Sequence, residues 1–190
     1  MDIIELIRHK IESTLSSRRL DHTHGTAQVC LYLADRFSLD LHSALIASLW
    51  HDCCREWNSR RLKHYVSRFA LEITPLEERE VQLLHGPAAA CRLFHELSCR
   101  NWDIWRAVRW HTTGSTRMGS LGYALFVADF IEPHRSHLDD LQREQLLSLD
   151  TLEEMMLHIY RMQFAWFEHQ QICIEEESLG LYRQLEERWA

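Results

Sequence analysis

Hydrophobic positions along this chain of 190 residues recur mostly at the three- and four-residue spacing of helices. At the N-terminus, Ile3, Ile4, Ile7 and Ile11 fall on one side of a helix expected over residues 2–16. Only 6 glycines and 3 prolines interrupt the chain, and no segment alternates apolar and polar residues as a half-buried strand would. The pattern therefore predicts an all-α fold.

Capping residues and prolines mark where several of these helices begin and end. Asp40 is a candidate N-cap for the helix carrying LHSALIASLWHD, and Asn101 for a tryptophan-rich helix that ends at His111. The sequence TPLE at residues 74–77 has the pattern of a capping box with proline at the first helical position. Pro133 ends the helix LGYALFVADFI. Further helices are expected over about 21–37, within 53–73, from about 85, and twice between about 150 and 188.

Length and composition limit the kind of protein this can be. A chain of 190 residues without a linker, repeat or low-complexity tract is expected to form a single domain over residues 1–190. The net charge of −7 argues against a binder of extended nucleic acid, which needs a basic face. No apolar run approaches the roughly 20 residues of a membrane helix. The N-terminus lacks a signal-peptide core, and the 6 cysteines form no CxxC pair. A cytoplasmic protein is expected.

The stretch ASLWHDCCRE raises the first question of chemistry. It places His51 and Asp52 side by side at the end of an apolar run, and burying such a pair costs free energy unless both residues find strong partners. One explanation is a helix end that emerges into water. The other is a metal site.

Two further helices carry a polar side chain on an apolar face. Asp129 follows Leu125 and Phe126 by about one turn, and His111 follows Ala107 and Val108 in the same way. A carboxylate in such a place needs a cation or several donors, so an ion pair with a buried arginine is the alternative for Asp129. A lone histidine there is most simply a core residue with satisfied hydrogen bonds.

The candidates share a feature that these individual explanations leave out. Five separate segments each bring one or two imidazole or carboxylate groups to a small or apolar helix face. Such ligands without thiolate suit iron, manganese, zinc or cobalt. The candidate ligands are His22, His51, Asp52, His85, His111 and Asp129.

The order of these residues and the motifs around them resemble a known family. RLDHTHG is similar to R-x-x-H-x-x-G, LLHGPAAA to an H-G helix start, WHTTG with Met118 to H-T-T-G…M, and VADFIEPHR to A-D-x-I-E-P-x-R. Together they resemble the HD-domain phosphohydrolases, in particular the YqeK-type branch of symmetrical diadenosine tetraphosphate hydrolases. The resemblance implies a helical HD-domain bundle with a metal-binding core over about residues 19–135 and C-terminal helices over about 138–190.

The resemblance also implies a ligand set for two divalent metal ions. Asp52 would bridge the two ions as part of both sets. Similar enzymes are reported with iron, and manganese, cobalt and zinc are the alternatives. The first ion would be held by His22, His51, Asp52 and Asp129, and the second by Asp52, His85 and His111.

A second group of residues is implied for catalysis and substrate binding. Arg55 stands where the family more usually has lysine, and Ser115 follows Gly114 where the family usually has arginine, so that Arg117 lies two residues further on. The alternatives are an exposed arginine at a helix end for Arg55 and a helix-end ion pair for the EPxR segment. The implied catalytic residues are Asp52 and Arg55, and the implied substrate-binding residues are Arg55, Thr112, Thr113, Gly114, Arg117, Glu132 and Arg135.

The implied function is the cleavage of a small dinucleoside tetraphosphate into two nucleoside diphosphates. No nucleic acid or membrane is expected as a partner, and a homodimer stays open. Two alternatives remain at this point. The first is an HD-type hydrolase acting on a nucleoside mono- or triphosphate or a cyclic dinucleotide, and the second is a non-catalytic nucleotide-binding regulatory module.

Overall fold

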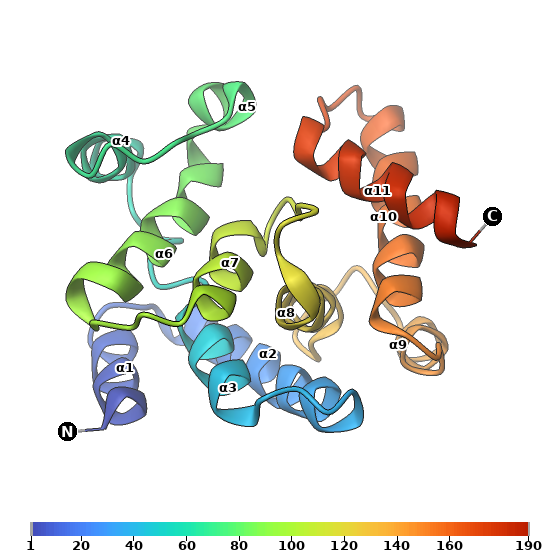
Figure 1. Cartoon of the computed structure of the whole chain (residues 1–190), viewed down its shortest axis with the longest axis horizontal. Coiled ribbons are helices and arrows are strands. Elements are labelled where there is room, and N and C mark those ends of the chain that lie inside the picture. The colour runs from blue at the N-terminus through green and yellow to red at the C-terminus, as the bar shows by residue number, and fades with distance from the viewer. Residues whose placement is uncertain (1, 190) are drawn as a thin grey trace.

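Within residues 2–189, which the computed structural model describes, the chain forms eleven α-helices, one short 3-10 helix and no strand. The predicted all-α fold is confirmed. Figure 1 shows the helices: α1 (Ile3–Glu12), α2 (Ser17–Arg36), α3 (Leu41–Trp50), α4 (Ser59–Arg68), α5 (Pro75–Arg79), η1 (Val81–Leu84), α6 (His85–Glu96), α7 (Trp102–Trp110), α8 (Gly119–Ile131), α9 (Asp140–Leu147), α10 (Leu152–His169) and α11 (Glu176–Trp189).

The predicted caps account for several helix starts. Asp40 accepts a hydrogen bond from the backbone N–H of Ser43, Asn101 caps α7, and Thr74 forms the expected reciprocal capping box with Glu77 at α5. The predicted boundary between the first two helices was wrong. Helix α1 ends at Glu12, and Ser16 caps α2 by accepting from the N–H of Arg19. Ser16 therefore begins the second helix instead of ending the first.

The C-terminal region contains an additional helix, α9, before the two amphipathic helices expected after residue 150. Helix α9 begins with a capping box between Asp139 and Gln142. The expected helices correspond to α10 and α11.

Helix α8 lies at the centre of the molecule. It packs against α2, α3 and α7 on one side and against α10 on the other (Figure 1). Ala124, Leu125 and Ala128 are fully buried in it, and the alanines let neighbouring helices approach closely. Because α8 is enclosed on both sides, its one interior carboxylate, Asp129, points toward the helices that carry the candidate histidines. No helix within residues 2–189 is long and apolar enough to cross a membrane.

The last two long helices fasten the loop that follows α7. Tyr160 of α10 and Ser178 of α11 both donate hydrogen bonds to the backbone carbonyl of Thr113, at 2.9 and 2.6 Å. Glu177 accepts a further bond from the Ser115 hydroxyl at 2.7 Å. Gly114 has a φ of +75°, and a Cβ at this position would lie 1.8 Å from the Tyr160 oxygen. This segment, called the 112–118 loop below, therefore depends on glycine and on α10 and α11.

Candidate metal centre

The structure brings the candidate ligands from all five segments into one cluster. They come from the middle of α2, the turn after α3, the first residue of α6, the end of α7 and the last turns of α8. Five of them are 6% exposed or less, and Asp129 is half-buried. The cluster consists of His22, His51, Asp52, His85, His111 and Asp129.

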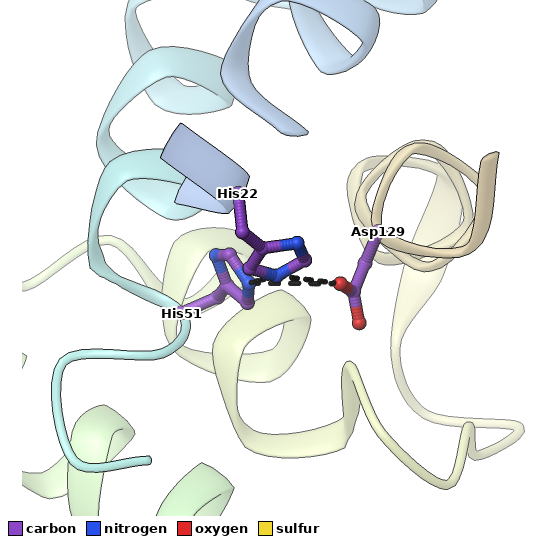
Figure 2. Close-up of side chains that lie close together, drawn as sticks. All are labelled: His22, His51 and Asp129. Atoms are coloured by element: carbon purple, nitrogen blue, oxygen red, sulfur yellow. Dashed lines mark hydrogen bonds and ion pairs between the residues drawn. The ribbon is translucent and has the colours of Figure 1, made fainter. Parts of the chain in front are cut away.

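One half of the cluster is formed by two histidines and the carboxylate of α8. Figure 2 shows His22, His51 and Asp129 pointing toward one another from α2, the end of α3 and α8. The Nε2 atom of His22 lies 3.0 Å from Oδ1 of Asp129 and 3.4 Å from Nε2 of His51. These donor atoms all fall within 4.8 Å of one another, so a single metal ion could contact all three.

The other half is formed by His85 and His111, whose Nε2 atoms are 3.1 Å apart. Asp52 lies between the two halves. Its Oδ1 atom is 3.3 Å from His85 Nε2 and 3.5 Å from His111 Nε2. Its Oδ2 atom is 3.5 Å from His22 Nε2 and 3.7 Å from His51 Nε2. One carboxylate therefore faces both pairs of histidines, one oxygen to each pair.

In each of the four histidines, the Nδ1 atom on the side away from the cluster makes a hydrogen bond that orients the ring. The Nδ1 atoms of His51, His85 and His111 lie 2.7, 2.5 and 2.8 Å from backbone carbonyl oxygens. A carbonyl only accepts, so these Nδ1 atoms carry the proton, and Nε2 of each neutral ring presents its lone pair to the cluster. For His22 the acceptor is Oε1 of Glu132, at 3.0 Å. Donation from the far ring nitrogen is the usual support of a metal-binding histidine.

Burial and neighbouring charge act in opposite directions on two histidines of the cluster. Burial lowers the pKa of His51 to about 4, since the nearby carboxylates compensate for it only in part. Burial also disfavours the charged form of His22, but hydrogen bonds to Asp129 and Asp52 outweigh this and raise its pKa to about 9. The metal-free cluster therefore holds its positive charge on His22, between the carboxylates.

The two central carboxylates remain ionised. Burial would raise the pKa of Asp52, but its interactions with His51 and the other nearby histidines hold it well below its usual range. For Asp129, hydrogen bonding to His22 and the charge of Arg135 likewise outweigh burial and lower the pKa. Arg135 Nη2 lies 2.5 Å from Asp129 Oδ1, so the ion pair considered for this aspartate exists alongside its contact with His22.

The residues predicted to bind substrate lie at different distances from this cluster. The hydroxyl of Thr112 is 3.1 Å from Nε2 of both His85 and His111. Arg135 contacts Asp129, and Arg55 and Thr113 line a cavity together with Thr112. Thr112 and Arg135 therefore contact the cluster, and Arg55 and Thr113 lie in the cavity beside Thr112.

Glu132 and Arg117, which were also predicted to bind substrate, make contacts with other residues of the protein. Glu132 is 1% exposed and bonds to Nδ1 of His22, behind the cluster. Its distance of 3.9 Å from Arg135 Nε leaves the helix-end ion pair weak. Arg117 extends away from the cluster and pairs with Glu177 at 2.7 Å.

Sequence reasoning left one charged neighbour of the cluster out of the site. Arg19 Nη1 lies 2.6 Å from Oδ2 of Asp52. The signal was present in the R-x-x-H spacing, because residues 19 and 22 lie on adjacent positions of one helix face.

The donors fit divalent metal ions in kind and in arrangement. Neutral imidazole nitrogens and ionised carboxylates are the ligands that iron, manganese, cobalt and zinc accept. All Nε2 atoms converge, and each ring is held by an outer acceptor.

Comparison with solved structures shows the same fold elsewhere. A crystal structure from Clostridium acetobutylicum, described as a predicted HD superfamily hydrolase involved in NAD metabolism, superposes with a TM-score of 0.89 at 22% identity over 97% of both chains.

Comparison with curated sequences finds relatives with a common name. A Bacillus subtilis protein is 31% identical over 126 residues, which is 66% of this chain and 67% of the relative. A Staphylococcus aureus protein is 24% identical over 97% of both chains. Both are named symmetrical bis(5'-nucleosyl)-tetraphosphatase. The HD domain family matches residues 19–149. The chain therefore belongs to the HD domain family, as its motifs predicted.

Proposed function

We propose that this protein is a metal-dependent hydrolase that cleaves diadenosine tetraphosphate symmetrically into two ADP molecules. The observation that carries the proposal is the position of Asp52, with one carboxylate oxygen toward each pair of histidines. This arrangement suits two cations that share a ligand. The relatives named for this reaction support the choice of substrate.

Two divalent ions in such a cluster supply Lewis acidity, which lowers the pKa of a water molecule and offsets charge on phosphoryl oxygens. Iron is the first candidate, with manganese, cobalt and zinc as alternatives. The ligands proposed are His22, His51, Asp52 and Asp129 for one ion and Asp52, His85 and His111 for the other.

The chain's own residues around the cluster would hold the polyphosphate and stabilise the departing diphosphate. Arg135 contacts Asp129 and Arg55 lines the cavity beside Thr112, and guanidinium groups match phosphate oxygens in geometry and charge. Thr112 places a hydroxyl beside His85 and His111. The positive φ of Gly114 shapes the loop, and its N–H donates to the Trp110 carbonyl at 2.7 Å. Positive charge near the leaving oxygens lowers the barrier, because negative charge develops there as the bond breaks.

The proposed substrate is a free small molecule in the cytoplasm, with neither nucleic acid nor membrane as a partner. Arg117 would reach the phosphates only if its ion pair with Glu177 opened.

Product analysis after reaction tests the proposal. The protein is purified without oxygen and incubated with diadenosine tetraphosphate and iron(II), and the nucleotides are separated by anion exchange. We expect ADP alone, and at least about a hundredfold lower rate for Asp52→Asn, which keeps the shape of the side chain but removes its charge. Asp103→Asn, at an exposed carboxylate on α7, is the matched control and should retain full activity.

Two results would contradict it. AMP together with ATP would exclude the symmetrical cut. Absence of turnover with iron, manganese and cobalt would favour another nucleotide substrate or a binding module.

A further inference from the structure

Two cavities meet at Thr112, whose hydroxyl lies beside His85 and His111. The first cavity has a volume of about 520 Å³, and the second cavity one of about 600 Å³. Both fall within the range of about 300–1,000 Å³ that is usual for small-molecule sites. They share Thr112 of the loop and Gln163 and Phe167 of α10, so these three residues form the wall between them.

The two cavities repeat the same chemistry. The first cavity has Arg135 beside the candidate ligands His111 and Asp129, and accessible aromatic rings from Phe130 and Trp166. The second cavity has Arg55, three residues after Asp52, and aromatic rings from Phe164 and the shared Phe167. An arginine matches phosphate oxygens, and an aromatic face stacks on a nucleobase. Each cavity therefore has what one nucleoside diphosphate requires.

We infer that the two cavities receive the two nucleoside ends of one substrate molecule, and that α10 separates them through Gln163 and Phe167. This inference rests on the proposed function. The central phosphoric anhydride bond of a dinucleoside tetraphosphate would then lie beside Thr112, at equal chain distance from both bases. The symmetry of the cut follows from the two ends being held alike.

A third cavity of about 340 Å³ reaches the cluster at His22 and competes for one end of the substrate. It is lined by Arg18, Arg19 and Arg135, and its described lining residues include no phenylalanine, tyrosine or tryptophan. Its chemistry suits phosphate oxygens better than a base, so we assign the bases to the two cavities that contain aromatic rings.

Filling each cavity in turn tests the inference. Met162→Trp places an indole in the first cavity and Leu83→Trp places one in the second. Leu41→Trp, at an exposed position at the start of α3, is the matched control. For diadenosine tetraphosphate we expect each filled variant to raise KM about tenfold or more through the loss of one base contact, with a smaller change in kcat. For adenosine 5'-tetraphosphate, which has one base, either single filling should change KM less than threefold.

ADP binding to the metal-loaded protein gives a measurement without turnover. Isothermal titration should show two ADP molecules per wild-type chain and one per filled variant, with folding checked by circular dichroism. One ADP per wild-type chain, or an unchanged KM in the Leu83→Trp variant, would overturn the inference. If Arg18→Ala raised KM strongly and Leu83→Trp did not, the second nucleoside end would bind in the third cavity and the inference would be wrong. Two ADP per chain without any hydrolysis would leave the two sites in place and contradict the proposed function instead.

Discussion

Glu132 shows how a residue behind the metal centre can control it. Its Oε1 accepts from Nδ1 of His22 and its Oε2 accepts from the backbone N–H of His134. We predict that Glu132→Gln, which keeps the size but loses the charge, weakens metal binding about 10–100-fold because His22 loses its orienting acceptor. Competition for cobalt or manganese against a chromogenic chelator measures this. His134→Ala keeps the carboxylate and should change the affinity less than threefold, and equal losses in the two variants would exclude the orienting role.

Gly25 packs closely against the same carboxylate of Glu132. A Cβ on this residue would lie 2.5 Å from Oε2 of Glu132 and 3.0 Å from Nδ1 of His134. We predict that Gly25→Ala displaces Glu132 and lowers metal affinity about tenfold. The control is Gly180→Ala in α11, where a Cβ meets nothing within 4 Å. It should leave metal affinity unchanged and stabilise the fold by about 0.5–1 kcal/mol, because alanine is the better helix residue. An unchanged affinity in Gly25→Ala would contradict the prediction.

At the residue scale, the sequence predicted which polar residues gather in one cluster better than it predicted the contacts of the other residues. Asp52 and Asp129 stood out because a buried carboxylate needs partners, and this is a local property of a helix face. Arg117 could not be placed in this way. Its partner Glu177 lies 60 residues further along the chain, and nothing near Arg117 signals that pairing.

At the scale of elements, the attachment of the 112–118 loop to α10 and α11 can be measured as a coupling. Tyr160 and Ser178 donate to the same carbonyl of Thr113. We predict that Tyr160→Phe and Ser178→Ala each cost about 0.5–1.5 kcal/mol, whereas the double variant costs more than their sum because the carbonyl then loses both donors. Urea denaturation of the four proteins measures this. Additive losses would show that the two bonds act independently.

Helix starts were predictable where a cap and a hydrophobic run stood together. Asp40, Thr74 and Asn101 each precede such a run, and each was found as a cap. The start of α2 was missed because the polar stretch after Glu12 separates two helices by only a few residues, and Ser16 could have belonged to either. Helix α9 was missed because only Leu146 is buried in it, so its hydrophobic pattern is weak.

At the scale of the whole molecule, the metal centre joins helices that are distant in the sequence. The ligands span residues 22 to 129 and come from α2, α8 and the ends of α3, α6 and α7. We predict that a divalent ion at a hundred times its Kd stabilises the fold by about 2.7 kcal/mol. For a chain of this size that corresponds to a Tm higher by roughly 5–11 °C. Differential scanning fluorimetry with and without a chelator measures the shift.

The Asp52→Ala variant serves as the control for this measurement, since it lacks the carboxylate that faces both pairs of histidines. The increase in Tm that metal causes in this variant should be less than half of the increase in the wild-type protein. An equal shift in both proteins would mean that the ion binds elsewhere.

The attachment of the 112–118 loop to α10 and α11 also sets an order of events during synthesis. The candidate ligands leave the ribosome before Ser178, which lies 49 residues after Asp129. At about 5–20 residues per second, the growing chain carries its complete set of ligands for a few seconds before that donor is made. The loop beside the ligands gains its hydrogen bonds to Ser178 and Glu177 only when α11 docks. An interrupted chain would therefore contain every candidate ligand and still lack the hydrogen bonds that α11 makes with this loop.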